Sequence, residues 1–394
     1  YEILIGLVGS EMCIRDSFVK YEYPELLPNL STAKSPQQMF GAIAKTYYAQ
    51  QLGVEPEEIY CLSIMPCTAK KYESQMACMD NEGLFHRAVV MSAMIRSPYQ
   101  VGGIGVPEEL WHAEENGQHF LSFLGCSTIE QARKLDAAAI RDKYEEYTKI
   151  FPAMFTVLDH KFCVGDPMVL FMEGKHVNVP VMSGNTSDEF PSYIEASSKE
   201  DLKKKAEEIF GKNAETFLRF PEAMREDSDG KYAKVNGIEC TIKCLFSDKK
   251  SAGEKKPYYY YRFDSDIPGW DNAGTFHSVD LWFFFETLAK CWRPFVGRHY
   301  DLSRMMCNYW VNFIKTGDPN GNDADGKPMP YWYPYEKEKP CEMIFMSDRP
   351  VVNCGWVTPF KEFLQEQIKK TLSTGSDQNS WNVKKGDYNE QVKD

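Results

Sequence analysis

Four short runs of β-branched, aromatic and other apolar residues predict buried strands in this chain. They occupy residues 59–65, 87–91, 179–182 and 258–261, and polar residues bound the second and third runs. Such compact apolar runs are typical of parallel strands that are covered on both faces. The last run, Tyr258 to Tyr261, fits an aromatic-rich central strand.

Two amphipathic helices have recognisable ends. The first begins at Ser35-Pro36, because serine is a good N-cap and the missing N–H of proline costs nothing there, and it ends at Gly53. Asp301 can cap the second helix, which stops at Gly317-Asp318-Pro319. Their apolar faces contain Met39, Phe40, Ile43 and Tyr47 in the first helix and Met305, Tyr309 and Phe313 in the second. Helices and buried strands together predict an α/β fold.

Length and composition fit a folded chain with a sizeable core. The 394 residues are 43% hydrophobic, enough for one large α/β domain or two smaller ones. The net charge of −12 argues against nucleic acid or an anionic membrane surface as a partner. No apolar run reaches the roughly 18 residues that a membrane-spanning helix needs.

The cysteines do not form a recognisable metal site. There are twelve, and Cys240 and Cys244 have no second Cys or His pair at zinc-ligand spacing. We therefore expect no metal, whereas disulfides and the redox compartment remain open.

The two ends of the chain differ from the rest. Residues 1–17 contain EMCIRDS, which resembles translated sequencing-adapter read-through from a metagenomic assembly; an ordinary strand and loop is the alternative. Residues 373–394 are polar and unpatterned, which predicts a disordered tail. We expect no function in residues 1–17.

Residues 18–73 contain the motif MPCTAKKYE directly after the first predicted strand. This segment resembles the active domain of [FeFe]-hydrogenases, whose second cluster motif is MPCxxKxxE. The resemblance implies that Cys67 would be a thiolate ligand of an iron–sulfur cubane, that Met65 would pack on the cluster, and that Lys70 would bind a diatomic ligand of the di-iron site.

The other hydrogenase motifs are missing. Adapter-like sequence stands where the first cysteine motif belongs, and MAC at Met76 to Cys78 is followed by Met79 and Asp80 instead of a glycine-rich ligand loop. One cysteine cannot hold a cluster that takes about four thiolates. We therefore interpret Cys67 as an inert loop thiol and expect no cofactor.

From Ser74 onward the chain resembles a different family. The matching stretches, in order, are EGLFHRAVVMS, FLGCSTIEQARKLDA, GDPMVLFMEGK, VPVMSGNTSDEF, GTFHSVDLWFFF, CWRPF and MCNYWVNFIKTGDPNG. They resemble type-B carboxylesterases, the cholinesterase and lipase-like group, over residues 74–372. The resemblance implies the C-terminal part of an α/β-hydrolase fold, an incomplete sheet of mainly parallel strands with helices, and hydrolysis of a small-molecule ester.

Within these stretches, Glu189 and His277 stand in the chain order of an acid and a histidine of the hydrolase triad. The resemblance implies that Glu189 orients His277 and stabilises the imidazolium formed during proton transfer. Two alternatives remain: Glu189 as a helix N-terminal carboxylate, since Asp188-Glu189 could open a helix, and His277 as an ordinary loop histidine. We interpret the other six histidines as surface or core side chains.

The nucleophile of the triad is missing from its expected place. No G-x-S-x-G elbow occurs in the chain, and Pro66 to Lys70 stands in its position without the glycines that the strained turn needs. Cys67 and Thr68 are therefore poor substitutes. The glycine-rich oxyanion loop is absent upstream, and Val101 to Gly105 is better explained as a flexible loop.

Three hypotheses follow. The first is an ester hydrolase fragment fused to a hydrogenase fragment, inactive in this chain because the nucleophile and the oxyanion donors are missing. The second is a hydrogenase-derived redox protein, which the incomplete cluster ligands disfavour. The third is a non-catalytic binding protein on a hydrolase scaffold.

Overall fold

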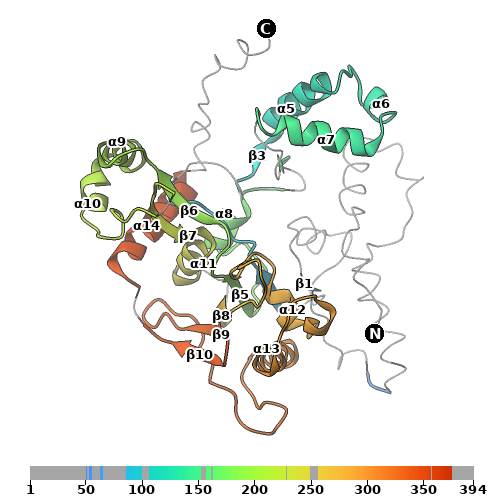
Figure 1. Ribbon diagram of the computed structural model, residues 1–394, viewed down its shortest axis with the longest axis vertical. Coiled ribbons are helices and arrows are strands. Elements are labelled where there is room, and N and C mark those ends of the chain that lie inside the picture. The colour runs from blue at the N-terminus through green and yellow to red at the C-terminus, as the bar shows by residue number, and fades with distance from the viewer. Residues whose placement is uncertain are drawn as a thin grey trace.

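A six-stranded sheet forms the centre of the computed structural model (Figure 1). The structure describes residues 50, 53–55, 63–64, 86–99, 106–151, 157–160, 163–227, 229–248, 256–355 and 357–374. The strand order is β1-β2-β5-β8-β9-β10. The strands are β1 (Ser63–Ile64), β2 (Ala88–Met91), β5 (Val181–Thr186), β8 (Tyr258–Asp264), β9 (Glu342–Met346) and β10 (Pro350–Asn353). The first five run parallel and β10 pairs antiparallel with β9, which confirms the predicted α/β fold.

The predicted strands are present where the structure describes them; of the first run, 59–65, only residues 63–64 are described, and they form β1. β5 begins at Val181, two residues later than predicted, and continues through Thr186. The shift follows from Pro180, which has no N–H to donate to a neighbouring strand. β8 lies between β5 and β9, so the predicted central position of the tyrosine run is confirmed.

The hydrogenase-like segment contributes a strand to this sheet. Ser63 pairs with Ala88 and Ile64 with Val89 in parallel register. β1 therefore lies directly beside β2, at the edge where the hydrolase resemblance expects the strand before the nucleophile. The residues after β1 that matter for chemistry, Met65, Cys67 and Lys70, lie outside the described part of the chain.

Helices cover both faces of the sheet, and the tyrosine run divides its side chains between them. Tyr259 and Tyr261 pack in the core beneath α12 (Asp280–Phe284) and α13 (Gly297–Thr316). Tyr258 and Tyr260 belong to the core beneath α8 (Pro167–Met172), α11 (Gly237–Ser247) and α14 (Pro359–Thr374). All four are buried, because alternate residues of a strand point to opposite faces.

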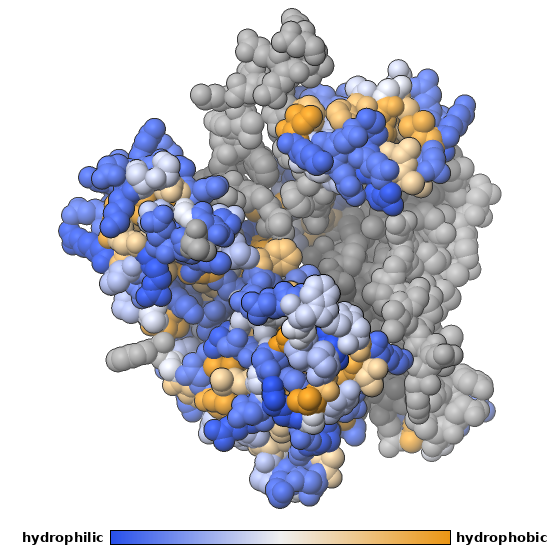
Figure 2. All heavy atoms as spheres, in the orientation of Figure 1, coloured by the Kyte–Doolittle hydropathy of each residue, from blue (hydrophilic) through white to orange (hydrophobic). Residues whose placement is uncertain are grey.

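Two smaller units flank the sheet (Figure 1). The antiparallel pair β6 (Pro191–Glu195) and β7 (Lys231–Asn236) carries α9 (Lys199–Phe210), the 3-10 turn η4 (Gly211–Asn213) and α10 (Ala214–Leu218). The second unit contains β3 (Glu108–Glu109), α5 (Leu110–Phe123), α6 (Ile129–Ala132), α7 (Ala137–Tyr147) and β4 (Val157–Leu158). Figure 2 shows a largely hydrophilic surface over α9 and α10, whereas apolar side chains reach the surface over the α5–α7 unit. None of the described helices has the length and apolar character needed to cross a membrane.

The predicted start of the second amphipathic helix is wrong. α13 begins at Gly297, so Asp301 lies inside the helix, where its carboxylate pairs with Arg304 at 2.7 Å. The buried His299 takes over the capping role, since its Nδ1 accepts the Val296 N–H at 3.0 Å. The predicted end is confirmed, because Gly317 adopts the left-handed conformation with φ of 81°. α14 extends to Thr374, just past the predicted boundary at Leu372, and the tail after it is outside the described residues.

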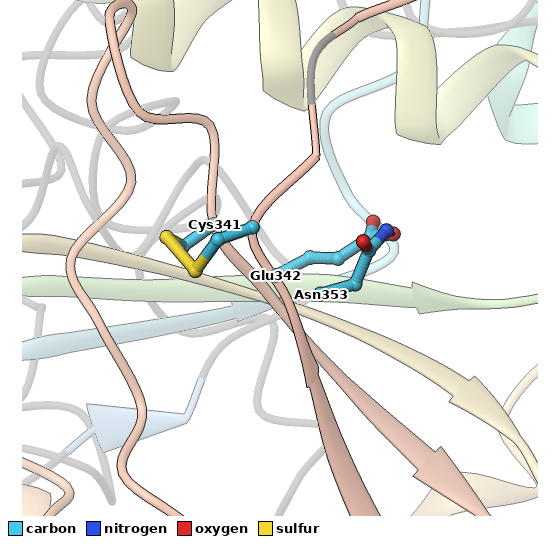
Figure 3. Close-up of a disulfide and its surroundings, with 4 residues drawn as sticks. Cys341, Glu342 and Asn353 are labelled. Atoms are coloured by element: carbon cyan, nitrogen blue, oxygen red, sulfur yellow. Dashed lines mark hydrogen bonds between the residues drawn. A yellow bond between two sulfur atoms is a disulfide. The ribbon is translucent and has the colours of Figure 1, made fainter.

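A disulfide joins the two strands at the edge of the sheet. Cys341 and Cys354 lie next to the paired residues Glu342 and Asn353 of β9 and β10, so the bridge crosses the hairpin (Figure 3). Asn353 also donates to the Glu342 carboxylate at 2.8 Å. A closed loop of this size stabilises a fold by about 3 kcal/mol in the chain-entropy model. The sequence left open whether the chain contains disulfides, and the structure shows one at this hairpin.

Gly184 is expected to tolerate no side chain. It pairs with Tyr261 across β5 and β8, and a Cβ at Gly184 would lie 2.3 Å from the buried tyrosine ring. We expect Gly184→Ala to lower the free energy of unfolding by about 3 kcal/mol, because the packed ring has no room to move. Guanidinium unfolding of the variant measures this.

A second glycine provides the matched control. Gly117 lies within α5, and nothing lies within 4 Å of the place where its Cβ would stand. Gly117→Ala should raise the free energy of unfolding by about 0.5–1 kcal/mol. Equal stabilities for Gly184→Ala and the unmodified chain would contradict the packing of β5 against β8.

Candidate active site

Glu189 lies just beyond the carboxyl end of β5, with its side chain completely buried. Its Oε1 accepts two hydrogen bonds, from the Thr186 N–H at 2.7 Å and from the Ser92 hydroxyl at 2.6 Å. Ser92 follows β2, the strand beside β5, so the carboxyl ends of neighbouring parallel strands bring these groups to one edge. A buried carboxylate needs such donors to offset its lost hydration.

His277 approaches the second oxygen of this carboxylate. Its Nδ1 lies 2.5 Å from Oε2 of Glu189, although the two residues are 88 positions apart in the chain. An ionised carboxylate can only accept, so Nδ1 carries the proton and Nε2 of the neutral imidazole is left as an acceptor. The His277 side chain is 50% exposed, whereas that of Glu189 is 0% exposed. The acid is thus enclosed while the histidine reaches the surface of the site.

The loop around Glu189 contradicts one of the alternatives for this residue. Asp188-Glu189 opens no helix: a turn follows, and the next element is the strand β6. Phe190 in that turn has φ of 40°, and its ring meets the His277 ring edge-on at 4.9 Å. Glu189 is therefore not a helix N-terminal carboxylate. The turn directs it toward the histidine instead.

Sequence reasoning did not find Ser92 or Asp280, which also surround the acid. Ser92 directly follows a predicted strand, which is a weak signal of a site at that edge. Asp280 lies three residues after His277 and is buried, with its carboxylate accepting from the Tyr261 hydroxyl at 2.9 Å. Burial raises the pKa of Asp280 to about 7, and the Glu189 charge raises it as well, whereas the bond from Tyr261 lowers it.

Asp280 should make stability depend on pH in the direction opposite to that of most carboxyl groups. Its pKa is raised in the folded state, so between about pH 4 and pH 7 the folded chain holds a proton that the unfolded chain has lost. Stability from this group is therefore greatest at low pH and falls as the pH rises to 7, by about 4 kcal/mol at most. Asp280→Asn keeps an acceptor for Tyr261 and removes the titration.

Chemical unfolding at pH 5 and pH 8 measures this difference. We expect Asp280→Asn to be more stable than the unmodified chain at pH 8, with the advantage disappearing toward pH 4. An identical pH dependence of the two proteins would contradict a raised pKa for Asp280.

The cofactor residues that the hydrogenase resemblance implies are not described by the structure. Cys67, Met65 and Lys70 fall outside the described residues, as do Thr68 and the Val101 to Gly105 loop. Among the described residues, no group of three or more His, Cys, Asp or Glu side chains is placed to hold a metal ion. The motif around Cys67 provides one thiolate, which does not fit a four-thiolate cluster.

A buried acid is thus paired with a half-exposed histidine at the carboxyl edge of the mainly parallel sheet. Comparisons with known proteins match two separate parts of the chain. Residues 237–353 match the carboxylesterase family, and residues 15–91 match the C-terminal domain of the iron-only hydrogenase large subunit. One part of the chain is thus similar to hydrogenases and another part is similar to carboxylesterases.

The N-terminal match is strong but short. Iron hydrogenase 1 from Clostridium pasteurianum is 52% identical over 62 residues, which are 16% of this chain and 11% of that protein. The NADP-reducing hydrogenase subunit HndD from Solidesulfovibrio fructosivorans is 61% identical over 56 residues, 14% of this chain and 10% of that protein. The chain therefore spans about a tenth of the length of these relatives.

The structural match covers most of the chain. An esterase from Clostridium hathewayi that hydrolyses aliphatic aromatic polyesters aligns with a TM-score of 0.50 and 21% identity, over 86% of this chain and 67% of that one. The PNB esterase aligns with a TM-score of 0.50 and 20% identity, over 82% and 64% of the two chains. These similarities establish the α/β-hydrolase fold.

Proposed function

We propose that residues 74–372 are the C-terminal part of a serine-type carboxylic ester hydrolase. Glu189 is the acid of its triad and His277 is the base. The observation that carries the proposal is the 2.5 Å contact between Nδ1 of His277 and the buried Glu189 carboxylate. The carboxylesterase-family match includes His277, and the fold brings both residues to the edge where α/β sheets bind ligands.

The chemistry of this pair follows from the hydrogen bonds. With Nδ1 donating to Glu189, Nε2 of His277 is the atom that accepts a proton from a hydroxyl as that hydroxyl attacks an ester carbonyl. Glu189 stabilises the resulting imidazolium, and the bonds from Ser92 and Thr186 hold the carboxylate in place. The substrate is a small-molecule ester, as the family match supports.

The nucleophilic hydroxyl of the triad belongs to the N-terminal part of an esterase. In this chain a hydrogenase-like segment stands in place of that part. We propose that the hydrogenase-like residues 18–73 are joined to the esterase region near residue 74, that residues 1–17 are an adapter-like artefactual leader, and that residues 373–394 are a polar disordered tail. β1 then occupies the neighbouring position to β2 in the sheet without supplying a G-x-S-x-G turn. The pair is a base and its orienting acid without their serine.

This proposal predicts that the chain as it stands hydrolyses esters very poorly. We expect no serine to be labelled by a fluorophosphonate probe and negligible turnover of short-chain aryl esters, because nucleophile and oxyanion donors supply most of the acceleration. His277→Ala serves as the control and should not change the background rate. Robust turnover that His277→Ala abolishes would show that another side chain is the nucleophile.

A further inference from the structure

Asp188, next to the candidate acid, connects the two loops of the site. Its Oδ2 accepts both the backbone N–H of Thr275 at 2.9 Å and the Thr275 hydroxyl at 3.0 Å. Its own N–H donates to the Thr275 carbonyl at 3.2 Å. Three hydrogen bonds therefore tie the residue before Glu189 to the residue two positions before His277.

The histidine loop is shaped to receive this carboxylate. Gly274 has φ of +63°, and a Cβ there would lie 2.6 Å from Oδ2 of Asp188. Thr275 is buried, which keeps its two donors away from water. A glycine at 274 thus allows the backbone to turn and to come close to Asp188. The contact is built into the loop rather than made by a mobile surface side chain.

A different residue holds the acid loop from behind. The Asn236 side-chain amide, at the start of α11, donates to the carbonyls of Thr186 at 3.0 Å and Glu189 at 3.1 Å. Its oxygen accepts the Glu239 N–H at 3.0 Å and so caps the helix. Asn236 fixes the acid loop to the helix layer, but it makes no bond to the histidine loop in the described structure. Asn236 therefore cannot set the distance between Glu189 and His277, whereas Asp188 can.

We propose that Asp188 is a positioning residue for the proton-transfer couple. It holds the 274–277 loop at the distance at which Nδ1 of His277 meets the Glu189 carboxylate. This inference rests on the proposed function, because it assigns Asp188 a role through Glu189 and His277. Loss of the two bonds to the Asp188 carboxylate leaves the histidine loop tied by the backbone bond alone, so the loop moves and the Nδ1 proton exchanges with water instead of staying in a short hydrogen bond.

Proton NMR of the full chain at low temperature tests this directly. A proton in a short bond to a carboxylate gives a strongly downfield resonance, assigned to His277 by its loss in His277→Gln. We expect Asp188→Ala to lose the resonance while the melting temperature stays close to that of the unmodified chain. Asp188→Asn retains an acceptor for the Thr275 N–H and should keep it. Glu195→Ala, which removes an exposed carboxylate from β6, is the matched control and should keep it too.

The outcomes separate the two proposals. A resonance that persists in Asp188→Ala overturns the positioning role and leaves the Glu189–His277 couple intact. Loss of the resonance in both Asp188→Ala and Asp188→Asn overturns the positioning role as well. The negative charge of Asp188, and not its hydrogen bonds to Thr275, would then maintain the resonance. Absence of the resonance from the unmodified chain contradicts the couple itself. Thr275→Val, which removes only the hydroxyl donor, should weaken the resonance and tests the same bridge from its other side if Asp188→Ala fails to fold.

Discussion

Replacing residues 1–73 with the front half of a related esterase is expected to produce ester hydrolysis that depends on His277. The segment of the PNB esterase that precedes its counterpart of β2 is a suitable donor, because the proposed function places the elbow serine and the oxyanion donors upstream of β2. In this hybrid, His277→Ala should lower kcat for short-chain aryl esters by about 10⁶, because the serine loses its base. Glu189→Gln should lower it by about 10⁴, because the histidine loses its orienting charge. Steady-state kinetics of the three proteins measures both effects.

Two controls make this experiment decisive. Circular dichroism and melting must show that the hybrid and its variants fold alike, and His112→Ala removes a histidine that pairs with Glu108 away from the site. His112→Ala should leave kcat within a few-fold of the hybrid. A folded hybrid that hydrolyses esters equally well with and without His277 would contradict the assignment of the base.

Removal of Lys243 is expected to destabilise the fold strongly. Lys243 lies in α11, on the face of the sheet that α8, α11 and α14 cover. Its ammonium is nearly buried and lies 2.8 Å from the Glu239 carboxylate and 2.7 Å from that of Glu342. Burial raises the pKa of Glu239, but the charges of Lys243 and Lys361 outweigh this and lower it to about 2. Lys243→Met leaves Glu342 buried without a cation, which costs about 3–5 kcal/mol. Chemical unfolding at neutral pH measures the loss.

A double variant separates charge from packing in this cluster. Glu239 keeps Lys361 at 2.5 Å, so only Glu342 is left without a cation when Lys243 is removed. Adding Glu342→Gln, whose amide can still contact Asn353, should restore a large part of the lost stability. If Lys243→Met costs less than about 1 kcal/mol, the cluster is not the buried ion network that the contacts indicate.

The sequence predicts four of the six strands of the sheet, and the signal is clearest for β5 and β8 because both faces of these strands are buried. Tyr258 to Tyr261 has no polar alternation, and the structure divides these tyrosines between two cores on either side of β8. The end of α13 was predictable because Gly317 carries its own local signal. The start of that helix was not, since it depends on a buried histidine that accepts the Val296 N–H and not on a standard capping residue.

The candidate site was predictable only in part. Glu189 and His277 were found because each lies in a long stretch that resembles one family. Ser92, Asp188 and Asp280 were missed, because their contacts depend on how parallel strands and two loops meet across about ninety residues of sequence. The disulfide partner of Cys341 lies only 13 residues away, but it could not be named because the sequence analysis did not predict the β9–β10 hairpin that brings Cys354 opposite it.

The state of the His277 imidazole in the unmodified chain tests the central claim most directly. Nitrogen-15 NMR of histidine-labelled protein reports which ring nitrogen carries the proton. With Glu189 as acceptor, neutral His277 should be protonated at Nδ1, and Glu189→Leu should abolish that preference. A His277 ring protonated at Nε2, or one that does not respond to the loss of Glu189, would show that the two residues do not form a proton-transfer couple.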